Sequence, residues 1–442
     1  MINTTALTDE INKIVTTKNL YYNQSRKIIF HLMDANLSFI PLKTLSMDIV
    51  RDYQGNISDE ISVTCMVTPG TWSDKIFPYI NNLEATIVLG GEPTLYTRYK
   101  AYVKNPVDFR KNNPQFSGVS TYTMDLADAV PIEVQLIPKI ITELLPMQCG
   151  TIFRNCTIED ALKSFIINEC NKVPGLTDND MLRGIDMVEA DNVNTYTNIP
   201  IPHDTHILDL PNFLQEKSFG IYQTGLGSYI QDGIWYIYPS FKTKRDDQQV
   251  RYVNVYIVEK DRYSDVENTW RMDGSDLYII ARLNGESMQA PIANYLNDGN
   301  GVRYVNPDVI GTEDHSVVKD NKSTINRAKT VNELFVRENP NEIKYAKLEI
   351  EKSNLNLYER ISRVEALSST SFSLEWQNSV PKLIKPGAIV KVHYLSEGNK
   401  VRVIEGIIAK AHHYNHSTRD GMYNNGYRTV SALYIITKEN IQ

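Results

Sequence analysis

The 442-residue sequence has few cysteines, and their spacing forms no metal or redox motif. The four are Cys65, Cys149, Cys156 and Cys170, and no two of them make a CxxC pair. We interpret them as free thiols of a protein that is assembled inside a cell, with disulfides as the alternative. They supply no evidence for a disulfide-stapled fold.

Long hydrophobic runs are also missing. No stretch approaches about 18 consecutive apolar residues, so we expect no membrane-spanning helix. The first residues, MINTTALTDEINKIV, lack the basic and then apolar layout of a signal peptide. The sequence therefore favours a protein that has no membrane partner.

The charges form no basic block. Lysine and arginine number 46 against 53 aspartate and glutamate, a net charge of −7. A loose group of basic residues, interrupted by Asp320, consists of Lys319, Lys322, Arg327 and Lys329. We interpret this segment as a solvated loop rather than a binding patch. Because phosphate contacts need clustered lysine and arginine, a dedicated nucleic-acid-binding protein is excluded.

Familiar catalytic motifs are absent as well. The sequence contains no GxSxG, HExxH, EF-hand loop or Walker A motif. Gly90-Gly91-Glu92-Pro93 lacks the GxxxxGK[ST] pattern and a following helix, so it predicts a hairpin turn rather than a phosphate-binding loop. Gly225-x-Gly227 fails as a phosphate loop for the same reason.

One histidine cluster is a candidate metal site. His412, His413 and His416 lie close together, with His393 nearby in the sequence. On a strand His412 and His413 point to opposite faces, and we place His416 in a polar turn, so three convergent ligands are not expected. We interpret the cluster as structural or solvated, with metal binding as the alternative.

Two weaker candidates complete the search. His203-Asp204-Thr205-His206 precedes a helix start and suits a loop, and Asp246-Asp247 follows Lys244-Arg245 as a solvated face. We therefore predict no catalytic residue, no cofactor site, no metal site and no enzymatic activity.

What the sequence does contain is tyrosine, 26 of them, in short strand-like segments. Ile132, Val134 and Leu136 alternate with polar residues, as in a half-buried strand. Further predicted strands are 27–32, 60–67, 84–89, 94–103, 250–259 and 276–283. Strands at this spacing with few helices between them predict antiparallel barrels or sandwiches.

One amphipathic helix is clear. It begins after Thr157, whose side chain can accept a hydrogen bond from the amide of Asp160. Its apolar stripe consists of Ile158, Ala161, Leu162, Phe165, Ile166 and Cys170. A second amphipathic helix is predicted at 355–367. Both stripes predict core packing.

Residues 199–241 are the most informative passage. Asp209-Leu210-Pro211 predicts a short helix capped by Asp209 and ended by Gly220. Strands are predicted at 220–224, 228–231 and 234–238, with Asp232-Gly233 as a hairpin turn.

The closing passage predicts a three-stranded meander. Pro386-Gly387 turns into a strand at 388–394, which is followed by strands at 401–411 and 427–437. An earlier strand is predicted at 372–376, from alternating Phe372, Leu374 and Trp376.

These patterns predict a mainly β protein: two tube-like antiparallel β-barrels with a mixed helical and β domain between them. We assign residues 1–24 to an N-terminal arm, 25–145 to the first barrel, 146–244 to the mixed domain and 245–438 to the second barrel. A polar passage at about 286–340 is predicted to be a surface insertion in the second barrel.

The order barrel, mixed domain, barrel resembles the baseplate hub proteins of contractile-tailed bacteriophages, a family related to the base of type VI secretion spike proteins. The resemblance covers about 25–438 and rests on two passages. One is 199–241, and the other is the closing meander with Pro386-Gly387, Gly406-Ile407-Ile408 and Leu433-Tyr434-Ile435. The insertion and the N-terminal arm have no counterpart in it.

The resemblance implies a structural virion protein in the tail baseplate, assembled in the host cytoplasm. Its implied partners are two further copies in a homotrimer, the tail tube protein, the central spike protein and other baseplate proteins, with DNA only in transit through a channel during genome ejection. A tail-associated cell-wall hydrolase and a single-barrel baseplate or tube protein are the alternatives.

Overall fold

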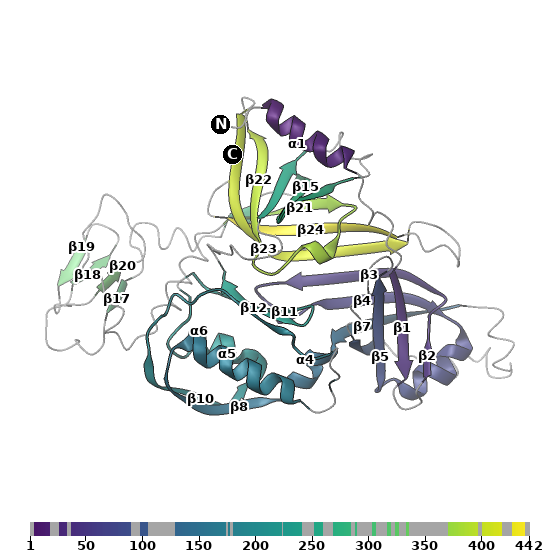
Figure 1. Cartoon of the computed structure of the whole chain (residues 1–442), viewed down its shortest axis with the longest axis horizontal. Helices are drawn as coiled ribbons and strands as arrows, with labels where there is room; N and C mark the ends of the chain where they lie inside the picture. Colours follow the sequence, from purple (N-terminus) through teal and green to yellow (C-terminus); the bar gives the residue numbers. More distant parts are fainter. Residues whose placement is uncertain are drawn as a thin grey trace.

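The computed structural model describes most of the chain and is dominated by one large twisted sheet (Figure 1). The described residues are 4–17, 26–32, 37–89, 98–104, 129–173, 176, 180–222, 224–240, 252–259, 268–283, 288–289, 303–305, 316–319, 323–326, 333–335, 370–396, 400–417 and 427–437. The sheet has 15 strands drawn from both ends of the chain. The mainly β class predicted from the sequence is confirmed.

One half of this sheet is the first β region, an antiparallel array in the order β3-β4-β7-β6-β5-β1-β2. The residues of β4 alternate between buried and partly exposed, so that the strand gives one face to a shared core. That core includes Phe30, Val63, Ala85 and Val134. The strands are β1 (Arg26–Leu32), β2 (Leu37–Phe39), β3 (Lys43–Asp52), β4 (Glu60–Val67), β5 (Leu83–Leu89), β6 (Arg98–Lys104) and β7 (Val130–Pro138). Two short helical turns, η2 (Thr71–Ile76) and η3 (Phe77–Tyr79), follow β4.

The other half closes into a six-stranded barrel in the order β13-β15-β21-β24-β23-β22, with β22 pairing back to β13. Its interior is filled by aromatic and branched side chains, among them Trp376, Val255, Leu374 and Ile435. The strands are β13 (Tyr252–Ile257), β15 (Asp276–Leu283), β21 (Thr370–Gln377), β22 (Ile389–Ser396), β23 (Lys400–Ser417) and β24 (Tyr427–Thr437). By strand pairing among the described residues, the first β region does not close in this way.

The barrel departs from the predicted antiparallel pattern at one strand. β13 runs parallel to both of its neighbours, β15 and β22. Its segment YVNVYI is buried on both faces, as is typical of parallel strands. Its interior face packs in the barrel core, and its outer face is covered by a helix described below. The closing meander β22-β23-β24 is antiparallel, as predicted.

Five short strands of the described residues fall in the predicted insertion, and four of them pair only with one another. These four form two separate two-stranded sheets, β17 (Arg303–Val305) with β20 (Glu333–Phe335) and β18 (Ser316–Lys319) with β19 (Ser323–Asn326). Figure 1 shows them apart from the rest of the chain. Two strands extend the barrel, β14 (Trp270–Asp273) on β15 and the fifth strand of the insertion, β16 (Met288–Gln289), on β21. The helix predicted at 355–367 lies outside the described residues.

The middle of the chain combines helices with two small sheets. A long two-stranded ribbon joins β8 (Gln148–Cys156) to β10 (Tyr196–His206), and a second sheet has the order β11-β12-β9. Its strands are β9 (Gly184–Met187), β11 (Leu226–Gln231) and β12 (Ile234–Pro239). The helices are α4 (Lys139–Leu144), α5 (Ile158–Glu169) and α6 (Leu210–Glu216), with the turns η5 (Cys170–Lys172) and η6 (Ile207–Asp209); a last turn, η10 (Pro381–Leu383), precedes β22 in the barrel.

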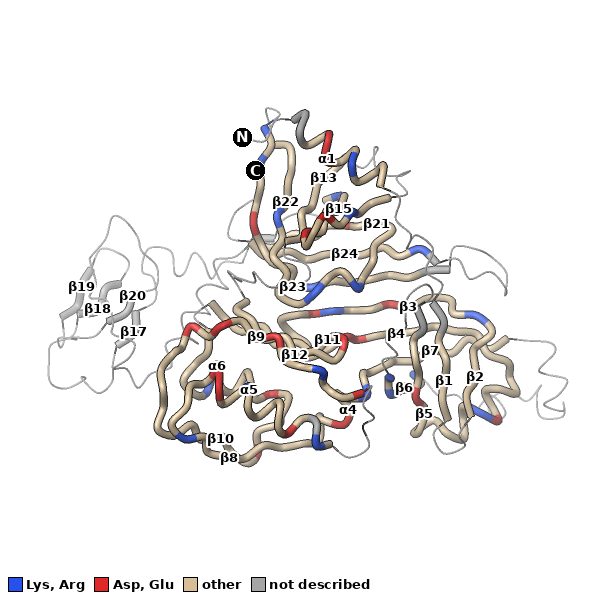
Figure 2. Tube along the Cα trace, in the orientation of Figure 1, with Lys and Arg blue, Asp and Glu red and all other residues tan. Residues whose placement is uncertain are grey.

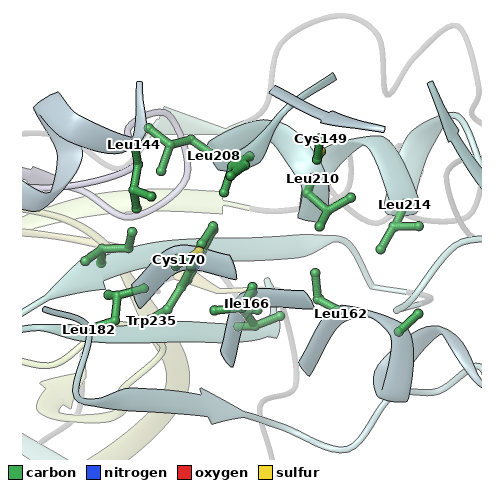
Figure 3. Close-up of a cluster of buried hydrophobic side chains, with 14 of the residues drawn as sticks. Leu144, Cys149, Leu162, Ile166, Cys170, Leu182, Leu208, Leu210, Leu214 and Trp235 are labelled. Carbon is green, nitrogen blue, oxygen red and sulfur yellow. The ribbon is translucent and has the colours of Figure 1, made fainter. Parts of the chain in front are cut away.

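The core of this middle region is formed by the predicted helical stripe. Leu162 and Ile166 of α5 lie in one cluster with Leu210 and Leu214 of α6 and with Trp235 of β12 (Figure 3). Thr157 accepts a hydrogen bond from the amide of Asp160, as predicted. The predicted cap at Asp209 is wrong, because that residue lies in a helical turn and its side chain makes no capping bond.

An N-terminal helix, α1 (Thr4–Thr16), covers the outer face of the closed barrel (Figure 1). Leu7 and Ile14 are buried against Tyr256 of β13 and Ile280 of β15. Within the residues that the structure describes, no helix has the length and apolarity needed to cross a membrane.

Candidate functional site at the junction of the two β regions

The two β regions are joined by a single long strand that both of them share. The first half of β23 pairs with β22, and its second half pairs with β24 on one side and with β3 on the other. The ladder with β3 runs from Lys410 opposite Asp52 to His416 opposite Ser46. Figure 1 shows β23 and β3 side by side. Backbone hydrogen bonds therefore fix the closed barrel to the first β region, and we call this contact the junction.

The junction contains buried polar side chains that bond across it. Asn415 of β23 is fully buried and donates to the carbonyl of Met47 on β3 at 2.9 Å. Its own carbonyl oxygen accepts from the hydroxyl of Thr429 on β24 at 2.6 Å. One amide side chain thus ties three strands together, and a buried amide needs such partners to offset its desolvation.

A histidine and two serines form a second buried group. His413 is fully buried, and its Nδ1 lies 2.6 Å from the hydroxyl oxygen of Ser431 on β24. Ser379 lies 2.5 Å from the same hydroxyl, oxygen to oxygen. These contacts explain why a polar histidine fits inside the sheet joint.

Arg51 of β3 is the centre of a third group, which we call the Arg51 cluster. Its guanidinium donates two bonds to one oxygen of Asp59, at 3.1 and 3.2 Å, and one bond to the carbonyl of Pro381 at 2.7 Å. The other oxygen of Asp59 accepts from the hydroxyl of Tyr229 at 2.8 Å. Asp59 follows β3, Tyr229 lies on β11 and Pro381 precedes β22. The cluster therefore joins all three regions at one point.

The electrostatics of the cluster favour its charged form. Burial alone would lower the pKa of Arg51, but Asp59, together with Tyr53, Asp232 and Tyr229, outweighs it and holds that pKa above the ordinary value. Burial and the nearby Asp59 raise the pKa of Tyr229, so it remains a neutral donor. A buried ion pair of this kind is costly to break, since either partner alone would be a buried charge.

Tyr238 of β12 fits between two glycines that leave room for its ring. A side-chain carbon on Gly227 would lie 2.3 Å from the ring, and one on Gly387 would lie 2.7 Å from it. Gly387 also has φ +69°, a conformation that favours glycine. The Tyr238 hydroxyl donates to the carbonyl of Tyr53 at 3.2 Å. The Pro386-Gly387 turn therefore fixes the middle region against the barrel.

Further polar contacts surround this packing. Gln231 donates to the carbonyl of Ile384 at 3.1 Å, and Lys385 forms an ion pair with Asp232 at 2.6 Å. Burial alone would raise the pKa of Asp232, but Lys385 and Arg51 outweigh it and hold that pKa below its ordinary value.

A small cleft lies beside the junction, between the first β region and the middle region. Its lining includes charges of both signs, from Arg98 and Arg183 and from Asp59, Asp180 and Asp232. Its volume is about 40 Å³, whereas sites for drug-sized ligands measure about 300–1,000 Å³. This cleft is too small for a sugar or peptide substrate.

Two of the histidines that were predicted to be structural lie on opposite faces of one strand, as the alternation of side chains along a strand predicts. His412 is half-buried beside Tyr414, and His413 is fully buried on the opposite face of β23. His416 is not in a turn, because β23 continues to Ser417 and pairs it with Ser46 and Arg428. His393 lies on β22, beneath α1 on the outer face of the barrel.

The other candidates are separate from this cluster. His203 and His206 are exposed on β10, a strand where we had predicted a loop. No group of three or more potential metal ligands comes together among the described residues. Asp246-Asp247 and Gly90-Gly91-Glu92-Pro93 lie outside them.

The cysteines are free in the structure. Burial raises the pKa of the Cys65 and Cys170 thiols to about 12 and that of Cys149 to about 11. Such thiols remain protonated at neutral pH, which makes them poor nucleophiles.

The sequence analysis missed the residues that form the junction. Arg51 and Asp59 are ordinary charged residues eight positions apart, and their partners are about 170 and 330 positions away. One signal was present in part: the aromatic passage 226–239 and the Pro386-Gly387 turn, singled out separately, meet at Tyr238.

Comparison with known proteins finds no matching family model and no curated protein that matches. Among solved structures, the 43 kDa tail protein of prophage MuSo2 from Shewanella oneidensis aligns over 94% of this chain and 97% of its own, with 10% identity and a TM-score of 0.45. The tail protein from Neisseria meningitidis MC58 aligns over 93% of this chain and 96% of its own, with 10% identity and a TM-score of 0.43.

A third structure is a type VI secretion component from E. coli, described as structurally similar to the T4 tail proteins gp27 and gp5. It aligns over 88% of this chain and 73% of its own, with 9% identity and a TM-score of 0.40. These neighbours are described as two tail proteins, one of them from a prophage, and a component of a type VI secretion system.

Proposed function

We propose that this protein is a structural component of a phage tail baseplate: a homotrimeric hub that joins a six-fold tail tube to a three-fold central spike. In this role it is not an enzyme. The observation that carries the proposal is the junction, where β23 and β3 fix two β regions of one chain into a continuous sheet. Three such chains would offer six β regions to a six-fold tube.

The division of the chain fits this role. We propose an N-terminal arm at 1–24, a first tube-like unit at 25–145, a mixed domain at 146–244 and a second unit at 245–438. Separate hydrophobic cores in the first β region, the middle region and the barrel support this division. The Arg51 cluster would hold the units at a constant angle, as a ring with fixed spacing requires.

Charge supports a role in DNA passage. The chain has a net charge of −7, and in Figure 2 lysine and arginine alternate along the trace with aspartate and glutamate. A bore lined by lysine and arginine would hold DNA through many phosphate contacts. We propose a channel lining that is neutral to negative, through which DNA slides during ejection.

Subunit contacts are proposed at apolar ends of the molecule. β2 ends the strand order of the first β region, and Leu37, Ile40 and Leu42 beside it are 55%, 60% and 43% exposed. We propose a second copy of the chain as the occupant of this surface, because a ring needs contacts at the ends of its units.

The test is assembly in vitro. The protein is mixed with candidate tail tube and spike proteins, and complexes are measured by native mass spectrometry. We expect the protein to bind both the tube protein and the spike protein. We also expect the double variant Leu37→Asp with Ile40→Asp to weaken the contact between copies of this chain at least about ten-fold. The control is Ile167→Asp on α5, a side chain that is 60% exposed and distant from β2 in the sequence. Binding to neither protein, or cleavage of purified peptidoglycan, would contradict the proposal.

One observation favours a second candidate, a baseplate or tube protein with a single barrel. Among the described residues, only one of the two β regions closes by strand pairing. The copy number decides between the two: a single-barrel protein would need six copies to match a six-fold tube, and the hub needs three.

A further inference from the structure

The N-terminal helix α1 lies across four strands of the closed barrel. It contacts β14 and β15 at one side and β23 at the other. In the strand order β15-β13-β22-β23, a helix that touches both β15 and β23 passes over β13 and β22. The strand registers put Ile280, Tyr256 and His393 in one row beneath it, and Val403, which is 40% exposed, continues the row beyond the covered part.

The contacts described for the helix from Leu7 onward are mainly apolar. Leu7 and Ile14 are its buried side chains, and Ile11 packs beside them. Glu10 forms an ion pair with Arg271 of β14 at 3.3 Å, and Asn268 donates to the carbonyl of Val15 at 3.3 Å. Two buried aliphatic side chains contribute only about 3–6 kcal/mol before the entropy of ordering the helix is subtracted. A small additional cost beneath the helix would therefore shift its docking.

His393 lies in that position. Its side chain is 8% exposed, and its ring stacks on Tyr256 with centroids 4.7 Å apart and planes at 21°. Neither ring nitrogen has a hydrogen-bond partner in the described part of the chain. Burial, with a smaller contribution from Lys391, lowers the pKa of His393 to about 4.

The charged groups nearest to His393 on the neighbouring strand positions are one lysine and one exposed carboxylate. On its own strand the neighbour on the same face is Lys391. The facing positions of β23 are Val403, directly opposite, with Val401 and Glu405 on either side, and the exposed Glu405 lies opposite Lys391. β13 presents Tyr256, whose pKa is raised by burial and by Glu10, and β15 presents Tyr278, whose pKa is raised by burial and by Asp276.

From α1 and β14 come the carboxylates of Glu10 and Asp273 and the cations of Lys13 and Arg271, and Asp273 is paired with Arg271. Both oxygens of Glu10 are already bonded, one to Lys13 and the other to Arg271. A proton on His393 would therefore lie under the helix beside Lys391, where Glu10 already bonds Lys13 and Arg271 and where Glu405 is exposed to solvent.

We propose that α1 is a releasable cover for the barrel's outer face, and that protonation of His393 releases it. The docked state favours neutral His393. Its stabilising contribution is fully present above about pH 6.5, the ordinary value for histidine, and is lost as the pH falls toward 4. Release would expose the apolar row of Tyr256 and Ile280 together with Leu7 and Ile14 of the helix.

The test is hydrogen exchange of the full-length protein between pH 7 and pH 4, with each rate divided by the intrinsic rate at that pH. We expect peptides of α1 to lose protection at least about ten-fold in the wild type. His393→Phe keeps a ring on Tyr256 but cannot be protonated, so its α1 should stay protected. His206→Phe, at an exposed histidine on β10, should behave as the wild type does.

Two further measurements distinguish local release of α1 from global unfolding of the protein. Peptides of β24 and β13 should remain protected while those of α1 exchange. Lys391→Met removes the nearby cation that lowers the pKa of His393 in the docked state, so the loss of α1 protection on acidification should be smaller than in the wild type. Loss of α1 protection that is equal in the wild type and in His393→Phe, or no loss down to pH 4, would overturn the proposal.

Discussion

The closed barrel makes two contacts of opposite character. At the junction with the first β region it uses a backbone ladder, the hydrogen bond that buried Arg51 donates to the carbonyl of Pro381, and the buried amide of Asn415. Against α1 it uses a few apolar side chains and one partly exposed ion pair. Polar groups that bond each other inside a joint specify one arrangement, whereas an apolar surface contact specifies little and is easily reversed. The first contact suits a fixed frame, and the second suits a part that moves.

Breaking the Arg51 cluster should have the largest effect. Arg51→Leu leaves Asp59 buried without its cation, and we expect a loss of about 3–5 kcal/mol in the free energy of unfolding. Urea denaturation followed by tryptophan fluorescence measures it. The control is Lys104→Leu, which removes a pair whose side chains are 37% and 48% exposed and should cost less than about 1 kcal/mol. Equal effects of the two variants would show that the cluster does not hold the junction.

Filling the space beside Tyr238 should have an intermediate effect. In Gly387→Ala the new carbon would approach the Tyr238 ring to 2.7 Å in a backbone of positive φ, so we expect about 2–4 kcal/mol of destabilisation. Gly274→Ala is the matched control, because it shares a positive φ of +61° but has nothing within 4 Å. Its cost should be about 1–2 kcal/mol from the backbone alone. The difference between the midpoints of the two variants' urea unfolding curves measures the cost of the contact with Tyr238. Equal midpoints would contradict the expected clash with the Tyr238 ring.

The ion pair between Lys385 and Asp232 should contribute least. Asp232 is 39% exposed, so solvent screens the pair, and Lys385→Met should cost at most about 1 kcal/mol at pH 7. Because the pKa of Asp232 is held below its ordinary value, this contribution is present above about pH 4 and is lost as the pH falls through the lowered pKa. Unfolding curves of both proteins at pH 7 and pH 3 should converge at the lower pH. If the difference in stability between the wild type and Lys385→Met were larger at pH 3 than at pH 7, the expected pH dependence would be wrong.

Local pattern was enough to predict several elements. The predicted bounds of β4 and β24 coincide with those in the structure, and Thr157 caps α5 as expected. In each case the signal lies within one segment: alternation along a strand, or a hydroxyl placed three residues before an amide.

Other elements could not be predicted because the deciding contact is distant or the pattern is broken. In β3, which the sequence analysis missed, a register shift between Thr44 and Ser46 interrupts the alternation. β10 carries Pro200 and Pro202, which argue against a strand but are tolerated in a two-stranded ribbon, where each strand keeps a free edge. The parallel direction of β13 depends on the cover that α1 supplies from the other end of the chain.

The candidate site was less predictable than the fold. Asp59 and Arg51 have no distinctive sequence context, and the cluster exists only because β3, β11 and the turn before β22 meet. The exception is glycine. Pro386-Gly387 was recognisable as a turn, although nothing local indicated that Tyr238 would pack against it.

The central claim is that one chain supplies two β regions to a three-fold ring. Native mass spectrometry of the purified protein, followed by cryo-electron microscopy of the same sample, tests it most directly. From a chain of 50.5 kDa we predict a species of about 152 kDa whose class averages show three-fold symmetry and six β regions around a bore. A monomer, or a ring of six chains with one barrel each at the bore, would contradict the account.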